Sequence, residues 1–104
     1  MKPLFFTPSA RNDLRDARRW YEAQRLGLGA AFDLAIEATL TRIQRMPAAH
    51  AMVGPHSLPA MRCAVVRRFP YEIYYQDEEA RVVILLVFHT AQNPARAVAR
   101  LRHH

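Results

Sequence analysis

The sequence predicts an α+β fold in which a hairpin of two helices packs on one face of a sheet. Three observations support this prediction: an apolar run at residues 4–6, two consecutive segments with helical spacing between 7 and 46, and strand patterns between 61 and 89. One sheet with the helical pair on one face is the simplest layered arrangement for that order. At 104 residues, the chain suits one core, and we expect residues 1–104 to form a single domain.

The first strand is predicted where the chain begins. Leu4, Phe5 and Phe6 form a short extended run after Lys2 and Pro3. Aromatic and apolar residues bounded by a proline are typical of a short strand.

The first helix is predicted within "TPSARNDLRDARRWYEAQ". Thr7 can accept a hydrogen bond at the helix start, and Pro8 suits the first turn, where its missing N–H has no partner in any case. One apolar stripe follows the 3.6-residue period, and it consists of Ala10, Leu14, Ala17 and Tyr21.

"LGLG", residues 26–29, is predicted to break the first helix, and its second glycine permits a tight reversal, after which the second helix follows at once. Its apolar ridge consists of Phe32, Ile36, Leu40 and Ile43. The ridge ends at Pro47, which cannot continue a helix. Two helices joined by so short a loop should pack as an antiparallel hairpin.

Residues 47–59 hold three prolines and a glycine with no sustained period, so a surface loop is predicted. Three strands follow, at about 61–68, 70–76 and 81–89, as a three-stranded antiparallel meander that completes the sheet. The acidic turn "QDEEA" makes the last two a hairpin. "VVILLVF" does not alternate, which is typical of a central strand covered on both faces.

The composition favours an anionic partner. The chain has 15 basic and nine acidic residues, a net charge of +6, and every basic residue except Lys2 is an arginine. Arginine forms bidentate contacts with phosphates and carboxylates, so a polyanion or an acidic protein is the expected partner class. A GC-rich genome would also give many arginines.

The cysteine count and the N-terminal segment indicate the cellular compartment that we expect for this protein. The single cysteine, Cys63, excludes an intrachain disulfide and leaves no CxxC pair for zinc, so no metal and no cofactor is expected. Its apolar surroundings predict a buried, inert thiol. The N-terminal apolar patch is too short for a signal peptide or a spanning helix, so a cytoplasmic location without membrane contact is expected. Whether His103 and His104 are native or the remnant of a tag is left open.

Four segments in this order resemble the RelE/ParE superfamily of bacterial type II toxins: "TPSARNDLRDARRWYE", "GLGAAF", "RRFPYEIYY" and "VVILLVFHTAQNP". The resemblance spans nearly the whole chain and is nearer to ParE than to RelE. It implies a toxin of a plasmid-stabilisation type, neutralised by a cognate antitoxin. ParE-like members inhibit DNA gyrase, whereas RelE-like members cut mRNA in the ribosomal A site.

The residues that RelE-like nucleases use do not match this sequence. Such toxins place an arginine after a tyrosine on the penultimate strand, a second arginine after the last strand, and a tyrosine in the tail. Here Glu72 stands at the first position, the second falls near Thr90, and the tail "NPARAVARLRHH" has no tyrosine. A carboxylate at the first position would repel a phosphate.

A histidine-based nuclease of the YoeB type is the alternative, with Arg68, Glu72 and His89 as the catalytic set, although an aromatic partner for the histidine is missing. A base, a cation for the developing charge and an acid would then all be present. The ParE-like reading needs no catalytic residues, so an enzyme is the less favoured outcome.

A target-binding surface is expected instead from residues of the strands and the tail. Adjacent Arg67 and Arg68 should point to opposite faces of a strand unless a bulge intervenes. Alternation assigns Tyr71 and Tyr75 to the helix-covered core and leaves Tyr74 for the open face. The candidate set is Arg62, Arg67, Arg68, Tyr74, His89, Arg96 and Arg100; the alternative is that these arginines form a solvated edge.

The expected partners are an antitoxin and DNA gyrase, with the ribosome and mRNA as the alternative target. A basic toxin with an open strand edge or helix groove suits an acidic amphipathic segment, and the groove is expected to involve the first two helices and the open sheet margin. A homodimer, a heterotetramer with the antitoxin, and a non-toxic basic binding module are left open.

Overall fold

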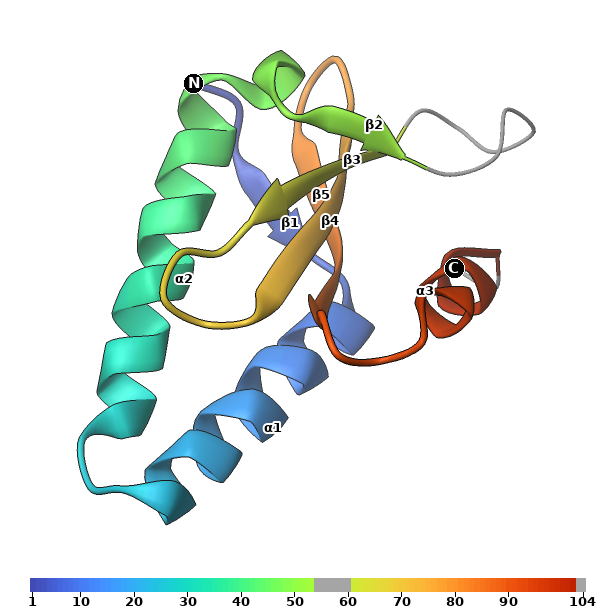
Figure 1. The fold of residues 1–104 in the computed structure, drawn as a ribbon. Coiled ribbons are helices and arrows are strands. Elements are labelled where there is room, and N and C mark those ends of the chain that lie inside the picture. Colours follow the sequence, from blue (N-terminus) through green and yellow to red (C-terminus); the bar gives the residue numbers. More distant parts are fainter. Residues whose placement is uncertain (54–60, 103–104) are drawn as a thin grey trace.

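The structure is a computed structural model that describes residues 1–53 and 61–102 (Figure 1). Its elements are β1 (Leu4–Phe6), α1 (Pro8–Gln24), α2 (Leu28–Arg45), the 3₁₀ turn η1 (Pro47–Ala49), β2 (Ala51–Val53), β3 (Met61–Val65), β4 (Tyr71–Asp77), β5 (Val82–His89) and α3 (Pro94–Arg102). The predicted first strand, both helices and the last two strands are confirmed, with ends within one or two residues of those expected.

One five-stranded sheet runs through the molecule in the order β1-β5-β4-β3-β2. β1 pairs in parallel with β5, and the other neighbours are antiparallel. β5 therefore lies inside the sheet, and its seven residues from Val82 to Phe88 are all buried. This confirms the α+β fold and the expectation that the unbroken apolar run forms a central strand.

The sheet has one strand more than predicted, because the expected loop at 47–59 contains η1 and β2. β2 pairs with β3 through Ala51 opposite Cys63 and Val53 opposite Met61. A three-residue edge strand is too short to show a side-chain period, and its pairing depends on backbone groups that every residue carries. His50, at its start, packs edge-on against Tyr75. The loop's other histidine, His56, lies outside the described residues.

The two helices cover one face of the sheet and meet as a V at the turn before α2 (Figure 1). The Thr7 hydroxyl accepts from the Ala10 N–H at 3.1 Å, which confirms the predicted cap of α1. Tyr21 of α1 stacks on Phe32 of α2 with ring centroids 5.2 Å apart. Ile73, which is fully buried, belongs to the same core cluster. The predicted helical hairpin thus forms around an aromatic cluster.

The turn between the helices depends on Glu22 and two glycines. The Glu22 carboxylate accepts the Gly27 N–H at 3.1 Å and the Gly29 N–H at 2.9 Å, and so caps α2 from α1. Gly27 adopts φ +89°, a left-handed conformation that favours glycine. A Cβ on Gly29 would lie 3.1 Å from the backbone oxygen of Arg18, so this glycine lets the helices approach closely.

α3, a helix that was not predicted, covers part of the other face of the sheet (red in Figure 1). Ala97 and Leu101 of α3 are buried with Leu85 and Phe88 of β5. Asn93 starts the helix, since its side chain accepts the Ala95 N–H at 3.0 Å. A cap at Asn93 and apolar residues four apart were available in the sequence, and they indicate a short amphipathic helix.

Arg100 ties α3 to α1. Its guanidinium donates to Asp13 Oδ2 at 2.9 Å and to the Ser9 hydroxyl. The same Asp13 oxygen accepts the Val87 N–H at 2.9 Å. β1 pairs with β5 only as far as Ile84, so Asp13 satisfies a β5 backbone group beyond the end of that partner strand.

Candidate functional site

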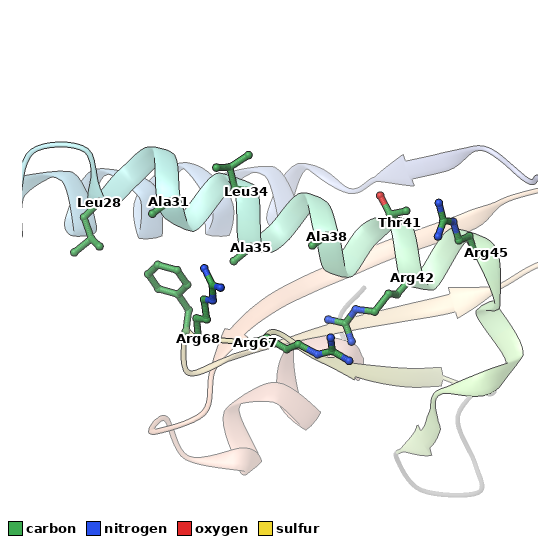
Figure 2. Close-up of a pocket in the computed structure, with 11 residues that line it drawn as sticks. Leu28, Ala31, Leu34, Ala35, Ala38, Thr41, Arg42, Arg45, Arg67 and Arg68 are labelled. Carbon is green, nitrogen blue, oxygen red and sulfur yellow. The ribbon is translucent and has the colours of Figure 1, made fainter.

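A groove of about 730 Å³ lies between α2 and the turn at residues 66–70 that joins β3 to β4 (Figure 2). One group of its lining residues is apolar: Leu28, Ala31, Leu34, Ala35, Ala38 and Phe69. A second group is cationic, and Thr41 completes the lining: Arg42, Arg45, Arg67 and Arg68. We call this the α2 groove. It combines an apolar wall with positive charge, and none of its described lining residues carries a carboxylate.

The β3–β4 turn brings Arg67 and Arg68 into the groove. β3 ends at Val65, earlier than the predicted strand at 61–68. The turn is closed by the Val66 N–H, which donates to the Tyr71 carbonyl at 2.9 Å. Both arginines therefore lie in a turn, and the expectation that strand alternation separates them was wrong. The sequence did not show where the strand ended, because "CAVV" continues the strand pattern.

Arg68 has a left-handed backbone, with φ +75°, and it is the one non-glycine residue with positive φ among those described. Phe69 follows it and packs into the aromatic cluster, edge-on to Tyr21 with ring centroids 4.9 Å apart. The left-handed residue thus lies between an exposed Arg67 and a side chain that enters the core.

Arg42 is held more firmly than the other groove arginines. Its guanidinium donates to the Val65 carbonyl at 3.2 Å and to the Thr39 hydroxyl at 3.1 Å. Within residues 1–53 and 61–102, none of the four guanidinium groups forms an ion pair. A groove with several cations and no internal counter-ion is suited to an anionic ligand.

Glu72 lies on the opposite face of the sheet, in a small polar cluster. Its Oε2 accepts from the Cys63 thiol at 2.8 Å and from the Tyr74 hydroxyl at 3.4 Å. Burial, followed by the neighbouring Glu72 carboxylate, raises the pKa of the Cys63 thiol. Cys63 is half-buried rather than fully buried as expected, but the raised pKa keeps it as an unreactive thiol. Tyr74 lies on the open face as predicted and packs edge-on against Phe88.

His89 contacts the helix-covered side through Tyr71, with ring centroids 5.0 Å apart. Its Nδ1 accepts the Ala91 N–H at 3.0 Å, so the neutral ring carries its proton on Nε2. Burial, and then the nearby Tyr21, raise the pKa of Tyr71 to about 12, which keeps this phenol neutral. The histidine thus orients the chain after β5.

The suggested nuclease set is not assembled. Tyr71 and Glu72 are consecutive on β4 and point to opposite faces, so His89, beside Tyr71, is separated from Glu72 by the sheet. Arg68 lines the α2 groove, whereas neither Glu72 nor His89 is among its described lining residues. These three residues therefore do not share a site in this structure.

The remaining predicted arginines are dispersed. Arg62 donates to the His50 carbonyl at 2.7 Å and supports the start of β2. Arg100 ties α3 to α1, and Arg96 is exposed on α3. Of the candidate target-binding set, only Arg67 and Arg68 come together in one groove.

Sequence reasoning missed Leu34, Arg42 and Arg45. Leu34 is 67% exposed, and it belongs to a second apolar stripe of α2 beside the buried ridge. Arg42 and Arg45 both belong to the last turn of α2. The helical spacing of these three residues was visible in the sequence. Only the tertiary structure shows that the face of α2 that carries them lies beside the β3–β4 turn. The expected groove partner, the first helix, contributes no lining residue among those described.

In the part of the chain that the structure describes, no group of three or more His, Cys, Asp and Glu side chains could hold a metal ion. None of the described helices combines the length and apolar character that crossing a bilayer requires.

The family model described as the ParE toxin of the type II toxin-antitoxin system parDE matches residues 4–94. This chain belongs to the ParE toxin family. A solved chain from the chromosomal ParDE TA system of P. aeruginosa has the same fold, with a TM-score of 0.59 and 18% identity. The alignment covers 86% of this chain and 96% of that one. No curated protein matches the sequence.

The ParE family assignment and the fold agree with the resemblance described above. The match spans the strand–helix–helix unit, the β3–β4 turn and the whole of β5. It places the α2 groove within the part of the chain that is characteristic of the ParE family.

Proposed function

We propose that this ParE-family toxin inhibits DNA gyrase and is neutralised by a cognate antitoxin that occupies the α2 groove. The observation that carries the proposal is the ParE family match over residues 4–94. The separation of Glu72 from His89 supports it, since inhibition of gyrase by binding requires no shared catalytic site. A gyrase inhibitor acts in the cytoplasm, where the bacterial chromosome lies.

Induced expression in growing bacteria tests the target, with two readouts: gyrase-linked DNA breaks and mRNA cleavage. We expect breaks, intact mRNA, and recovery of growth in strains with toxin-resistant gyrase alleles. Codon-linked mRNA cuts that persist in the gyrase-resistant strains would overturn the proposal and establish the nuclease alternative. Normal growth at full expression of folded protein would instead indicate a non-toxic binding module.

Neutralisation is tested by co-expressing the neighbouring reading frame. We expect a short acidic protein that co-purifies with the toxin and restores growth. Light scattering of the purified complex distinguishes a heterodimer from a heterotetramer, and the free toxin measured alone reveals any homodimer. A neighbouring product that neither binds nor restores growth contradicts the proposed pairing.

A further inference from the structure

The outer face of α1 is a second surface, separate from the α2 groove, since no residue of α1 is among the described lining of that groove. We propose that the toxin engages its target through this face. Its arginines meet an acidic protein surface, and Trp20 enters an apolar pocket of that surface. That the target is gyrase rests on the proposed function, whereas the chemistry of the face rests on α1 itself.

Three exposed arginines form a row along α1: Arg11, Arg15 and Arg19. They are four residues apart, so each lies one helical turn from the next, at intervals of about 6 Å, on a side that faces away from the core. Arg11 and Arg19 form no ion pair within the described residues. Arg15 donates to the Asn12 side chain at 2.9 Å and lies 3.9 Å from an Asp16 oxygen. The row is therefore largely free to bind an anionic partner.

The carboxylates of α1 do not balance this row. Asp13 accepts hydrogen bonds from α3 and β5, and Glu22 caps α2. Asp16 is the carboxylate that remains, with 72% of its side chain accessible. Like charges four residues apart destabilise a helix, so the row does not serve the stability of α1. A partner that supplies negative charge relieves this repulsion and gains attraction.

Trp20, the only tryptophan of the chain, is 59% exposed. Tryptophan is highly buried on average, and here water contacts much of its large apolar surface. Its ring packs edge-on against Tyr21 with centroids 5.1 Å apart, and Tyr21 stacks on Phe32 in the core. The indole is thus supported on one side by a core residue and presents the rest to solvent. Leu26, in the turn after α1, is 91% exposed and adds a second apolar side chain at the same end of the helix.

The arginine row and the indole belong to one continuous surface. Trp20 follows Arg19 directly, so the two side chains lie on adjacent strips of the same helix. Tryptophan and arginine are enriched among the residues that dominate the binding energy of protein interfaces. An acidic protein surface with an apolar pocket complements both.

A nucleic acid fits this face less well. Nucleic acids are bound chiefly through their phosphates, which need cations along the whole path. The row spans only about 12 Å of α1, and phosphate contacts leave the indole without a partner. A single strand stacks successive bases on exposed aromatic rings, whereas α1 exposes one such ring, because Tyr21 is buried.

Hydroxyl-radical footprinting of the full-length toxin tests the proposal, with oxidation read by mass spectrometry. Trp20 and Met52 are both oxidisable and are 59% and 60% exposed, but Met52 lies on the edge strand β2. We expect purified gyrase to reduce Trp20 oxidation about fivefold or more, as burial in an interface removes access to solvent, and to leave Met52 unchanged. Duplex DNA and a single-stranded oligonucleotide, each added without gyrase, should protect neither residue.

Substitutions test the same face in growing cells. Trp20→Gln and Arg19→Gln should each weaken growth inhibition about tenfold at matched expression, since single residues of this kind dominate interface energies. Both side chains are exposed, so the melting temperature should stay within a few degrees of the parent. Met52→Ala and Arg81→Gln replace equally exposed residues away from α1 and should remain fully toxic.

Two results would overturn the inference: Trp20 oxidation that is unchanged when gyrase is bound, and full toxicity of both α1 variants. Protection of Trp20 by an oligonucleotide and not by gyrase would make the face a nucleic-acid site instead. A toxic parent that does not bind gyrase would reject the proposed target alone, because the growth assay still reports whether α1 engages the true target. The footprint uses the unmodified toxin, so it decides the matter even where a variant folds poorly.

Discussion

Glu72 shows how a single residue separates two readings of this toxin. It stands where an RNA-cutting relative would present an arginine, and its carboxylate binds the Cys63 thiol and the Tyr74 hydroxyl. Because the Glu72 carboxylate accepts hydrogen bonds from two neighbouring side chains, its role here is to hold those side chains in place. A catalytic role would also need His89, which lies on the other side of the sheet.

Replacement of Glu72 by glutamine tests this interpretation. The amide oxygen can still accept both hydrogen bonds, so we expect the melting temperature of Glu72→Gln to stay within a few degrees of the parent. Toxicity should remain within a few-fold, measured as growth inhibition at matched expression. Complete loss of toxicity in a stably folded variant contradicts our reading and supports the nuclease alternative.

At the scale of elements, the helical hairpin depends on a carboxylate that belongs to one helix and caps the other. Hydrogen bonds from the Gly27 and then the Gly29 N–H groups lower the pKa of Glu22. The ionised form is therefore preferred in the folded state. Its contribution to stability is present above the ordinary glutamate pKa and is lost as the pH falls through the lowered folded-state value.

Glu22→Gln should therefore be less stable than the parent at neutral pH, and the gap should close in acid. Thermal unfolding of both proteins between neutral pH and about pH 3, below the ordinary glutamate pKa, measures the gap. Glu79→Gln, at an exposed position in the β4–β5 turn, serves as the control and should show no such trend. A gap that stays constant with pH would mean that the carboxylate charge does not stabilise the hairpin.

An ion pair connects α3 to α1. The Asp13–Arg100 pair is partly exposed, with 18% and 35% of the two side chains accessible. Arg100→Gln should therefore cost about 0.5–1 kcal/mol. Asp13→Ala should cost more, about 2 kcal/mol, since it also removes the acceptor of the half-buried Val87 N–H.

Denaturant unfolding of the two variants gives this order directly. Hydrogen exchange adds a second readout, because Arg100→Gln should speed exchange in α3 alone, whereas Asp13→Ala should also expose the Val87 amide. Equal losses of stability in the two variants would show that the ion pair, rather than the backbone acceptor, dominates.

At the scale of the whole molecule, α3 determines how much apolar surface the second face of the sheet exposes to solvent. Leu85, Phe88 and Met61 are buried there together with Ala97 and Leu101 of the helix. Without α3, contiguous apolar surface would meet water, which favours association.

A chain ending at Gln92 should therefore bind a hydrophobic dye and elute as larger species in size-exclusion chromatography, while the full chain does neither. The α1–α2 hairpin should remain, because the cluster of Tyr21, Phe32 and Phe69 is on the other face. Far-ultraviolet circular dichroism checks that retention. A truncated chain that stays dispersed would show that α3 is dispensable as a cover.

The fold class, both long helices, the central position of β5 and the inward-facing Tyr75 could be predicted from the sequence by itself. Each follows from a local period, a cap or a turn residue, and such patterns act within a few residues. The family followed from the same segments.

Tertiary structure decided where the functional groups meet. It ended β3 before Arg67, turned Arg68 left-handed, and set Arg67 opposite Arg42 of α2 (Figure 2). It also put Glu72 and His89 on opposite sides of the sheet. These placements depend on packing between residues far apart in the chain, and a side-chain period carries no information about them. The candidate site therefore exists only in the tertiary structure, in which α2 and the β3–β4 turn form one groove.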